Sequence, residues 1–381
     1  MSDHGVAPGL GWPEPDPDQQ APAQAELGWP EPDEGPAPAG PTRRTDTRRS
    51  RESLVREALA QASAPVSRET EASATPPDVS RETPAVNLAP FAADPETPIA
   101  SAAVAAMRVV DATPFPLPAE RRVITIANQK GGVGKTTTAV NLAAALALRG
   151  AQVLVLDLDP QGNASTALGV DHQAGVPSIY DVLIGGQSLA EVVATGAIPG
   201  LRCAPATIDL AGAEIELVSV VARESRLKKA LVAYTEPVDY VIIDCPPSLG
   251  LLTVNALVAA EELLIPIQCE YYALEGLGQL LRNIDLVRNH LNPELAVTAI
   301  LLTMYDARTR LADQVASEVR SHFGDLVLGS VIPRSVRISE APGYGQSVLT
   351  YDPTSPGAYA YLAAARELAA RGAPAGTEAA Q

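Results

Sequence analysis

A glycine-rich stretch between a predicted strand and a predicted helix constrains this chain more than any other feature. The segment from Arg122 to Thr138 reads RVITIANQKGGVGKTTT. Its β-branched start is typical of a buried strand. The Ala/Leu-rich segment 139–148 is typical of a helix, with Gly150 as its C-terminal cap. Strand, glycine-rich loop, lysine and helix in this order predict a phosphate-binding loop.

Such a loop supplies the groups that hold a polyphosphate. Backbone N–H groups and the helix N-terminus face the anion, Lys135 reaches the β- and γ-phosphates, and Thr136 is a ligand of Mg²⁺. We therefore expect ATP and Mg²⁺ as the ligand and cofactor. The loop residues expected to contact the nucleotide are Lys130, Gly131, Gly132, Val133, Gly134, Lys135, Thr136 and Thr137.

Carboxylates follow two further apolar segments. QVLVLD at 152–157 leads into Leu-Asp-Pro-Gln-Gly-Asn, which places Asp157 and Asp159 at the end of a predicted strand. Ligands of doubly wound sheets bind at this edge, although an Asp in such a turn can also be structural, Asp157 more so than Asp159. YVIID at 240–244 ends in Asp244, the Walker B arrangement, which predicts a role for Asp244 in the Mg²⁺ shell.

Strand and helix patterns alternate through the rest of the chain. This alternation predicts an α/β fold with a doubly wound, mostly parallel sheet, right-handed crossovers and helices on both faces. Predicted strands lie at 202–205, 263–268, 297–304 and 328–332. Predicted helices lie at 178–183, 189–193, 251–260, 274–291 and 311–323, with a longer helical region at 210–234.

Composition separates the chain into unequal parts. More than half of the 34 prolines precede residue 120, and the apolar segments follow it. We therefore predict a disordered acidic tail at 1–120, one folded P-loop domain at 121–371 and a flexible end at 372–381. The net charge is −17, and the tail, with 19 acidic against 9 basic residues, carries more of it than the domain. Neither part is a basic module, so any nucleic-acid contact must come from a local patch.

Three sequence features bear on the compartment. The three cysteines have no CxxC spacing and are an odd number, which is typical of buried thiols in a reducing environment. The acidic, Pro-rich start is not a signal peptide, and no apolar run approaches the length of a membrane span. We expect a soluble, intracellular protein without membrane insertion.

Several motifs give this sequence a family resemblance. KGGVGKT has Gln129 where the usual phosphate loop has glycine, and adds a second lysine, Lys130. This run resembles the deviant Walker A motif of the ParA/MinD family. The resemblance to its chromosomal, Soj-like ParA subgroup covers about 122–370, including DPQGN after Leu158 and the segments QCEYYALEGLGQL, LLTMYDARTR, VIPRSVRISEAPGYGQ and DPTSPGAYAY.

The resemblance implies roles for residues outside the standard loop. Lys130 would act on nucleotide held by a second subunit, and Asp159 would orient or activate the attacking water. Pro333 would line the adenine pocket. Arg308 and Arg334 would bind DNA without sequence preference, joined more weakly by Arg337.

The family also implies a reaction cycle. It predicts a cytoplasmic, nucleoid-associated ATPase of DNA segregation that is weak alone. Its ATP-bound homodimer would bind double-stranded DNA non-specifically, and a ParB-type centromere-binding protein would stimulate hydrolysis and release. Two rivals remain open. A MinD-like membrane ATPase needs a basic amphipathic C-terminal helix, but this chain ends AARELAARGAPAGTEAAQ. A metabolic P-loop ligase or amidotransferase needs a substrate pocket and a glutaminase-like Cys/His pair. A scaffolding role for the tail is compatible with the leading interpretation.

The tail contains two internal repeats. LGWPEPD occurs at 10–16 and again at 27–33, and holds both tryptophans of the chain. An inert linker and a bivalent docking peptide for a polar or cytoskeletal adaptor both fit this pattern. A chain lacking 1–40 that kept every binding partner would contradict docking.

VSRET occurs at 66–70 and 79–83. The centromere-like site of bacterial partition systems resembles GTTTCACGTGAAAC, which encodes Val-Ser-Arg-Glu-Thr in frame. We therefore hypothesise that the gene carries its own ParB sites, with local duplication as the alternative. Different synonymous codons in the gene would exclude the hypothesis.

Overall fold

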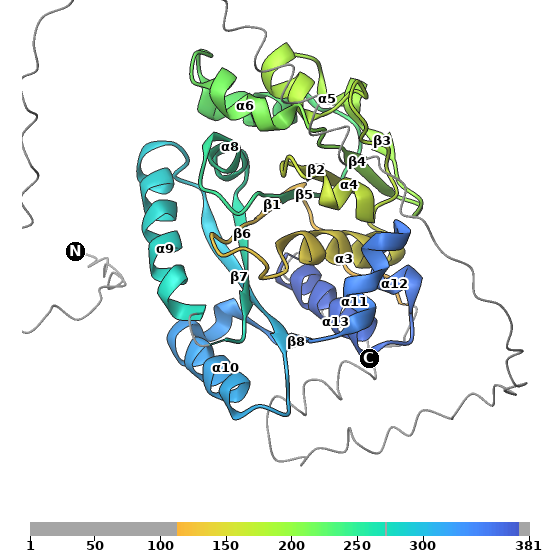
Figure 1. The fold of residues 1–381 in the computed structure, drawn as a ribbon, viewed down its shortest axis with the longest axis vertical. Coiled ribbons are helices and arrows are strands. Elements are labelled where there is room, and N and C mark those ends of the chain that lie inside the picture. Colours follow the sequence, from red (N-terminus) through yellow and green to blue (C-terminus); the bar gives the residue numbers. More distant parts are fainter. Residues whose placement is uncertain (1–112, 271–272, 373–381) are drawn as a thin grey trace, which may run out of the picture. The chain divides into compact units, whose positions relative to one another are not determined.

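The computed structural model describes residues 113–270 and 273–372 (Figure 1). The two tail repeats and the C-terminal end therefore lie outside the described residues. Phe115 precedes the predicted domain boundary at 121, yet it is buried, its N–H donates to the Arg149 carbonyl (3.2 Å), and the Arg149 guanidinium lies over its ring. The described domain thus makes packed contacts upstream of Arg121, while the boundary itself stays a prediction.

Eight strands form one sheet in the order β3-β4-β2-β5-β1-β6-β7-β8. All neighbouring pairs are parallel except β3 with β4. The strands are β1 (Arg122–Ile126), β2 (Val153–Asp157), β3 (Ala194–Thr195), β4 (Leu201–Ala204), β5 (Tyr240–Asp244), β6 (Glu262–Gln268), β7 (Ala296–Tyr305) and β8 (Val327–Pro333). This confirms the doubly wound, mostly parallel sheet, with a short antiparallel strand at one edge that the sequence did not reveal.

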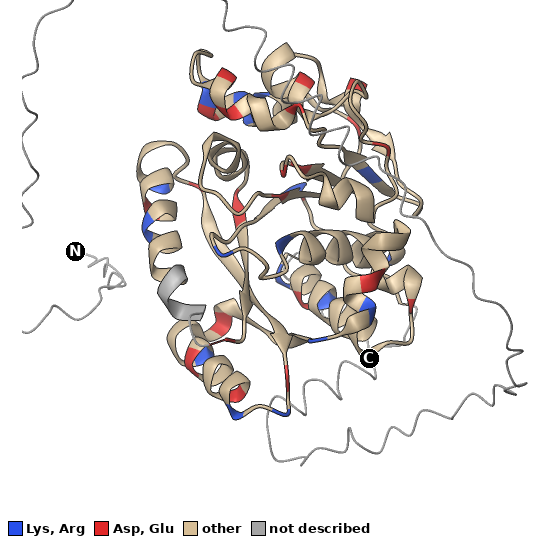
Figure 2. Ribbon diagram, viewed as in Figure 1, with Lys and Arg blue, Asp and Glu red and all other residues tan. Residues whose placement is uncertain are grey.

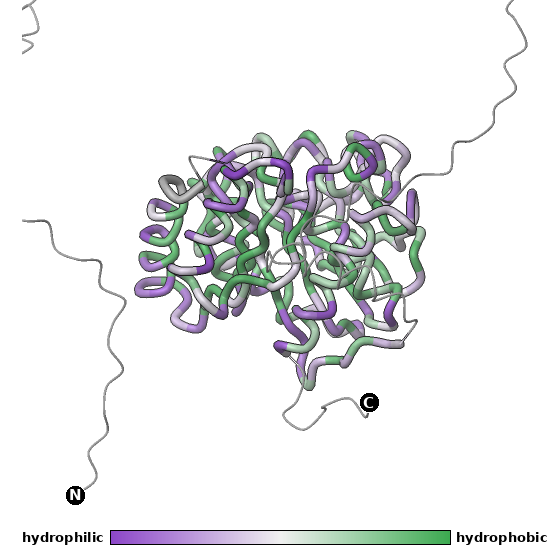
Figure 3. The backbone as a smooth tube through the Cα atoms, turned by 90° about the horizontal axis from the view of Figure 1, so that it is seen from below, coloured by the Kyte–Doolittle hydropathy of each residue, from purple (hydrophilic) through white to green (hydrophobic). Residues whose placement is uncertain are grey.

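Helices cover both faces of the sheet (Figure 1). Alternate strand residues face opposite layers: Val123 belongs to the apolar cluster beneath α6–α10, and Ile124 to the cluster beneath α3 and α13. The α-helices are α3 (Lys135–Leu148), α4 (Asn163–Ala167), α5 (Leu189–Val192), α6 (Leu210–Leu217), α7 (Arg226–Ala233), α8 (Leu251–Ala259), α9 (Ala273–His290), α10 (Arg310–Phe323), α11 (Val336–Glu340), α12 (Val348–Tyr351) and α13 (Pro356–Arg371). Hydrophobic segments gather inside and hydrophilic ones outside (Figure 3).

Most predicted strands and helices are confirmed, within a few residues at their ends. The helical region predicted at 210–234 is confirmed in part: it is divided into α6, a 3₁₀ turn at Arg223–Ser225 and α7. The break occurs at Ala222, whose φ of +54° lies outside helical space. No helix in the described part of the chain is long and apolar enough to cross a membrane.

Candidate functional site

The glycine-rich loop joins β1 to the N-terminus of α3, as the sequence predicts. Gly132 and Gly134 have φ values of +74° and +87°, which favour glycine and turn the chain into the helix. The Asn128 side chain fixes the start of the loop: its Nδ2 donates to the Pro266 carbonyl (2.8 Å) and its Oδ1 accepts from the Lys130 N–H (3.0 Å). Asn128 therefore ties the start of the loop to strand β6, and these bonds do not use the N–H groups from Gly131 onward.

The two lysines of the loop lie in different environments. Lys135 is buried, and its Nζ donates to the Lys130 carbonyl at 3.4 Å. Burial lowers the pKa of Lys135, although Asp244, Cys245 and Asp159 oppose that shift. Lys130 is partly exposed, and its Nζ lies 3.5 Å from the Glu270 carboxylate at the end of β6. Lys135 is thus buried beneath the loop, whereas Lys130 lies beside Glu270 with part of its side chain in solvent.

Three carboxylates lie at the carboxyl ends of β2 and β5. Asp157 and Asp244 are direct neighbours in the sheet register, and Asp244 also pairs with Ile126 of β1. Asp159 lies two residues beyond β2, buried, with Oδ1 accepting from the Gln161 N–H (3.0 Å). The structure therefore brings together the phosphate loop, Asp159 and Asp244, which are far apart in the sequence.

The Asp244 carboxylate is suited to a metal shell. It is fully buried, and neither oxygen has a hydrogen-bond partner among the described residues. Burial raises its pKa well above the usual range, helped by the Asp157 charge. The Thr136 hydroxyl opposes this shift but does not meet hydrogen-bond geometry. A buried carboxylate with two unmet acceptors is costly unless a cation or its bound water satisfies it. The residues present thus fit Mg²⁺, with Thr136 and Asp244 as the groups that would hold its shell.

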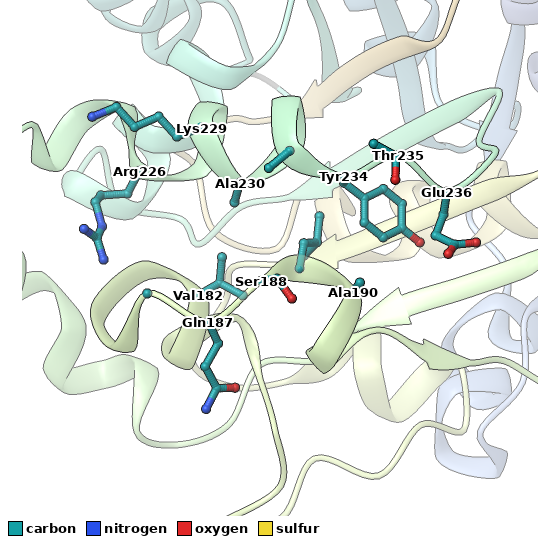
Figure 4. Close-up of a pocket in the computed structure, with 13 residues that line it drawn as sticks. Val182, Gln187, Ser188, Ala190, Arg226, Lys229, Ala230, Tyr234, Thr235 and Glu236 are labelled. Atoms are coloured by element: carbon teal, nitrogen blue, oxygen red, sulfur yellow. The ribbon is translucent and has the colours of Figure 1, made fainter.

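A cavity of about 380 Å³ lies elsewhere, between residues 182–190, which lead into α5, and helix α7 with the residues that follow it (Figure 4). Val182, Ala190 and Ala230 line it, and Arg226 and Lys229 stand at one end. It contains none of the predicted site residues. A second cavity of about 420 Å³ adjoins the phosphate loop, where Thr136 and Thr137 face Asn163 and Pro342. Pro333, the predicted adenine contact, ends β8 and lines neither cavity.

The three predicted DNA-binding arginines are exposed, and each is paired with a carboxylate. Arg308 follows β7 and makes two bonds to Asp306, of 2.8 Å and 2.7 Å. Arg334 follows β8 and lies 3.4 Å from Glu270, the partner of Lys130. Arg337, on α11, contacts Glu340 (3.2 Å) and Asp352 (3.4 Å). Acidic and basic residues are likewise interspersed along α10 (Figure 2). Arg308 and Arg334 are close in the sheet, since the Arg334 N–H donates to Tyr305 of β7.

Sequence reasoning missed the residues that support this site. Glu270, Asn128 and Thr303 contact loop residues from β6, the end of β1 and β7; the Thr303 hydroxyl donates to the Val133 carbonyl at 2.8 Å. Their roles depend on which strands are neighbours, which no local motif encodes. All three cysteines are free and buried, as predicted.

Comparisons with known proteins agree with this geometry. A family described as "AAA domain" matches residues 121–297. The chain is 54% identical over 251 residues to the sporulation initiation inhibitor protein Soj of Bacillus subtilis, covering 66% of this chain and 99% of that protein. It is 53% identical over 252 residues to the chromosome partitioning protein ParA of Caulobacter vibrioides, covering 66% and 94%.

A solved structure is also similar. The cobyrinic acid a,c-diamide synthase of Mycobacterium smegmatis, crystallised with an ATP analogue and magnesium, is 41% identical, with a TM-score of 0.57 over 66% of this chain and 93% of that one. The curated relatives match over nearly their whole length at higher identity. This chain therefore belongs to the ParA/Soj family of chromosome-partitioning P-loop ATPases.

Proposed function

We propose that this protein is an ATP-dependent DNA segregation ATPase that acts as a nucleotide-controlled dimer. The observation that carries the proposal is the meeting of two differently placed lysines, Lys130 and Lys135, with Asp159 and Asp244 at one edge of the sheet. The names of the curated relatives support chromosome partitioning as the process, and the solved relative supports ATP and Mg²⁺ as its ligands.

The residues divide the chemistry among them. Loop N–H groups from Gly131 to Thr137 bind the phosphates, and Lys135 neutralises charge from within the subunit. Bound Mg²⁺ would supply charge neutralisation on the β- and γ-phosphates. Asp159, whose charge acts on Lys135, would orient the attacking water, and Lys130 would reach the nucleotide of a second subunit. Hydrolysis of this kind needs positioning more than covalent chemistry.

An apolar surface at the same edge supports a subunit interface. Ile208, Ile215, Val218 and Val221, which we call the α6 patch, are 61% to 89% exposed. They follow the carboxyl end of β4, the edge that also carries the phosphate loop. Glu214 of α6 packs against Gly250, which follows β5: a Cβ atom added to Gly250 would lie 1.8 Å from the Glu214 carboxylate. Helix α6 therefore lies beside the segment that follows β5. Two copies facing each other across this edge would bury both patches.

Ile215→Glu is therefore expected to lower ATP-dependent dimerisation by at least about tenfold, because burying an aliphatic side chain of this size is worth about 1.5–3 kcal/mol and a buried charge costs more. Light scattering coupled to gel filtration, with ATP and with ADP, measures this. Leu286→Glu is the matched control, because Leu286 is 57% exposed near the end of α9, at the opposite edge. Equal loss in both variants, or loss in neither, would contradict the assignment of the interface.

DNA binding would follow from pairing two weak sites. Each subunit offers three exposed arginines, and a carboxylate of the same subunit competes for each. One subunit therefore binds phosphate weakly, and a dimer doubles the contacts and multiplies the binding constants. Because the chain carries a net charge of −17, affinity for DNA would depend on the dimer and hence on the nucleotide.

We expect retention on non-specific duplex DNA with ATP and little retention with ADP. Up to six arginines per dimer would give a slope of log affinity against log salt of roughly −5. Filter binding across a salt series measures both quantities. Equal retention with ADP would contradict the proposed cycle. Arg308→Ala and Arg334→Ala should each reduce the slope, whereas Arg288→Ala on α9, whose arginine pairs with Asp285, is a matched control.

The partner and the location follow from the same proposal. A ParB-type centromere-binding protein would accelerate hydrolysis and release the dimer, so the ATPase would be weak alone. The ATP-bound dimer would be cytoplasmic and associated with the nucleoid. Residues 1–120 would form a separate tail that carries the docking repeats, and 121–371 the ATPase domain.

Two other functions are less well supported. For a MinD-like membrane role, α13 is unsuitable, because much of it, including Ala364 and Leu368, is buried against the sheet. The name of the similar solved synthase favours a metabolic ligase as the second candidate. Its glutamine-dependent form would need an accessible thiol, whereas the three cysteines are buried. Cobyrinate amidation by the purified protein would favour this candidate.

A further inference from the structure

Asp157 is a fully buried carboxylate at the end of β2 whose hydrogen bonds all go to the segment that follows it. Oδ1 accepts from the backbone N–H of Asp159 at 3.1 Å. Oδ2 accepts from both the backbone N–H and the hydroxyl of Ser165, at 2.8 Å and 2.7 Å. Among the described residues no lysine or arginine pairs with it. One side chain thus anchors both ends of the loop that carries Asp159.

This anchor continues into a neighbouring strand. The Ser165 hydroxyl, which donates to Asp157, also accepts from the Ala206 N–H (3.2 Å), beyond the end of β4. The loop itself is closed by Asp159, whose carbonyl accepts from the Gly162 N–H (2.9 Å) and whose Oδ1 accepts from Gln161. The Asp159 side chain therefore extends from a backbone whose position is set at Asp157 and at Ser165.

A negative charge on the buried Asp157 side chain lowers the stability of the folded protein. Burial raises the pKa of Asp157 to about 6, with the neighbouring Asp159 charge adding to the shift and the hydrogen bonds from Ser165 and Asp159 opposing it. Asp157 also lies beside the buried Asp244. A buried carboxylate beside a second one, with no basic partner of its own, costs free energy. A neutral side chain could fill this space, so a carboxylate with three donors around it indicates a requirement for geometry.

We propose that Asp157 is a positioning residue for hydrolysis, which acts by fixing the backbone of Asp159 and the start of α4. The proposal rests on the proposed function, in which Asp159 orients the attacking water. It assigns to Asp157 no contact with nucleotide and no role in binding it. Loss of the anchor should therefore slow turnover without weakening ATP binding.

Asp157→Asn provides the test, because it keeps the shape and changes the hydrogen-bonding pattern. An amide has one accepting oxygen, but donors face both ends of this group. If the oxygen accepts from Ser165, the amide NH₂ meets the Asp159 N–H, donor against donor. A misplacement of about 1 Å can cost roughly 10²-fold in rate, so we expect kcat to fall at least about tenfold. KM for ATP should stay within about threefold of wild type, and ATP-dependent DNA retention should not weaken.

Ser165→Ala is the second variant, because it removes one donor to Asp157 and leaves both backbone donors in place. We expect a smaller fall in kcat, again with unchanged KM. Wild-type turnover in both variants, while Asp159→Ala is inactive, would overturn the proposal and leave the proposed function intact. If Asp157→Asn unfolds, Ser165→Ala decides: an unchanged kcat there, or a loss of ATP affinity that matches the loss of kcat, overturns it. Normal hydrolysis by Asp159→Ala would instead contradict the proposed function itself.

Discussion

Lys130→Ala and Lys135→Ala are each expected to lose at least about 10²-fold in ATP hydrolysis, and their mixture is expected to recover activity. Lys135 is buried below its own loop, with Nζ 3.4 Å from the Lys130 carbonyl. Lys130 instead lies at the surface beside Glu270. If Lys130 acts across the subunit boundary, a mixed dimer holds one complete site: Lys135 from the Lys130→Ala subunit and Lys130 from the Lys135→Ala subunit.

The mixing experiment measures phosphate release at equal concentrations of the two variants. Random pairing makes half of the dimers mixed, each with one complete site, so roughly a quarter of wild-type activity should return. Lys229→Ala is the control, because Lys229 is an exposed lysine of α7 away from the loop. A mixture no more active than its components would show that Lys130 acts within its own subunit.

Glu270 should influence how readily Lys130 leaves its own subunit. Its carboxylate lies 3.5 Å from Lys130 and 3.4 Å from Arg334, a phosphate-loop lysine and a DNA-binding candidate. Partly exposed pairs of this kind contribute about 0–1 kcal/mol each, so they oppose dimerisation only weakly. The same carboxylate is left with Arg334 once Lys130 moves away. In the dimer, Glu270 therefore still competes with DNA phosphate for Arg334. The doubled arginine contacts of the dimer have to outweigh this competition.

Local patterns predicted the parts of the fold that are periodic or bounded by turns. Tyr240–Asp244 is one example, because four apolar residues and an aspartate before Cys-Pro-Pro indicate a buried strand with a functional end. Helix α13 is the opposite case. Its Ala-rich segment was not predicted, because small residues give little amphipathic contrast, although Ala364 and Ala365 are fully buried against α3 and β8. Its burial depends on partners far away in the sequence.

The candidate site shows the same division. Lys135, Thr136 and Asp244 follow from local motifs, because the chemistry of the phosphate loop needs those residue types at that spacing. Their meeting depends on the strand order β2-β5-β1, which sets Asp157 and Asp244 side by side. No pattern within one segment contains that neighbour relation. The pairing of Glu270 with Lys130 and Arg334 could not be inferred for the same reason.

Asp159→Ala is expected to separate binding from hydrolysis. Asp159 is buried at the edge where the phosphate loop and Asp244 meet, yet it supplies no loop N–H group. Removing a residue that orients or activates the attacking water costs roughly 10²–10⁴-fold in rate. ATP affinity should change little, because the loop and Lys135 remain. The variant should therefore dimerise with ATP and stay on DNA instead of being released.

Three measurements on this variant form the test: ATP affinity, phosphate release and the lifetime of its DNA complex after free ATP is removed. We expect the first to match wild type, the second to fall and the third to lengthen. Asp171→Ala is the matched control, because Asp171 is an exposed carboxylate twelve positions further along the same segment, whose Oδ1 accepts only from the Gln173 N–H (3.1 Å). If Asp159→Ala released DNA as fast as wild type, hydrolysis would not be the step that ends DNA binding. If the variant also bound ATP more weakly, Asp159 would belong to the binding site. Removing a residue that acts only on the attacking water does not weaken the binding of ATP itself.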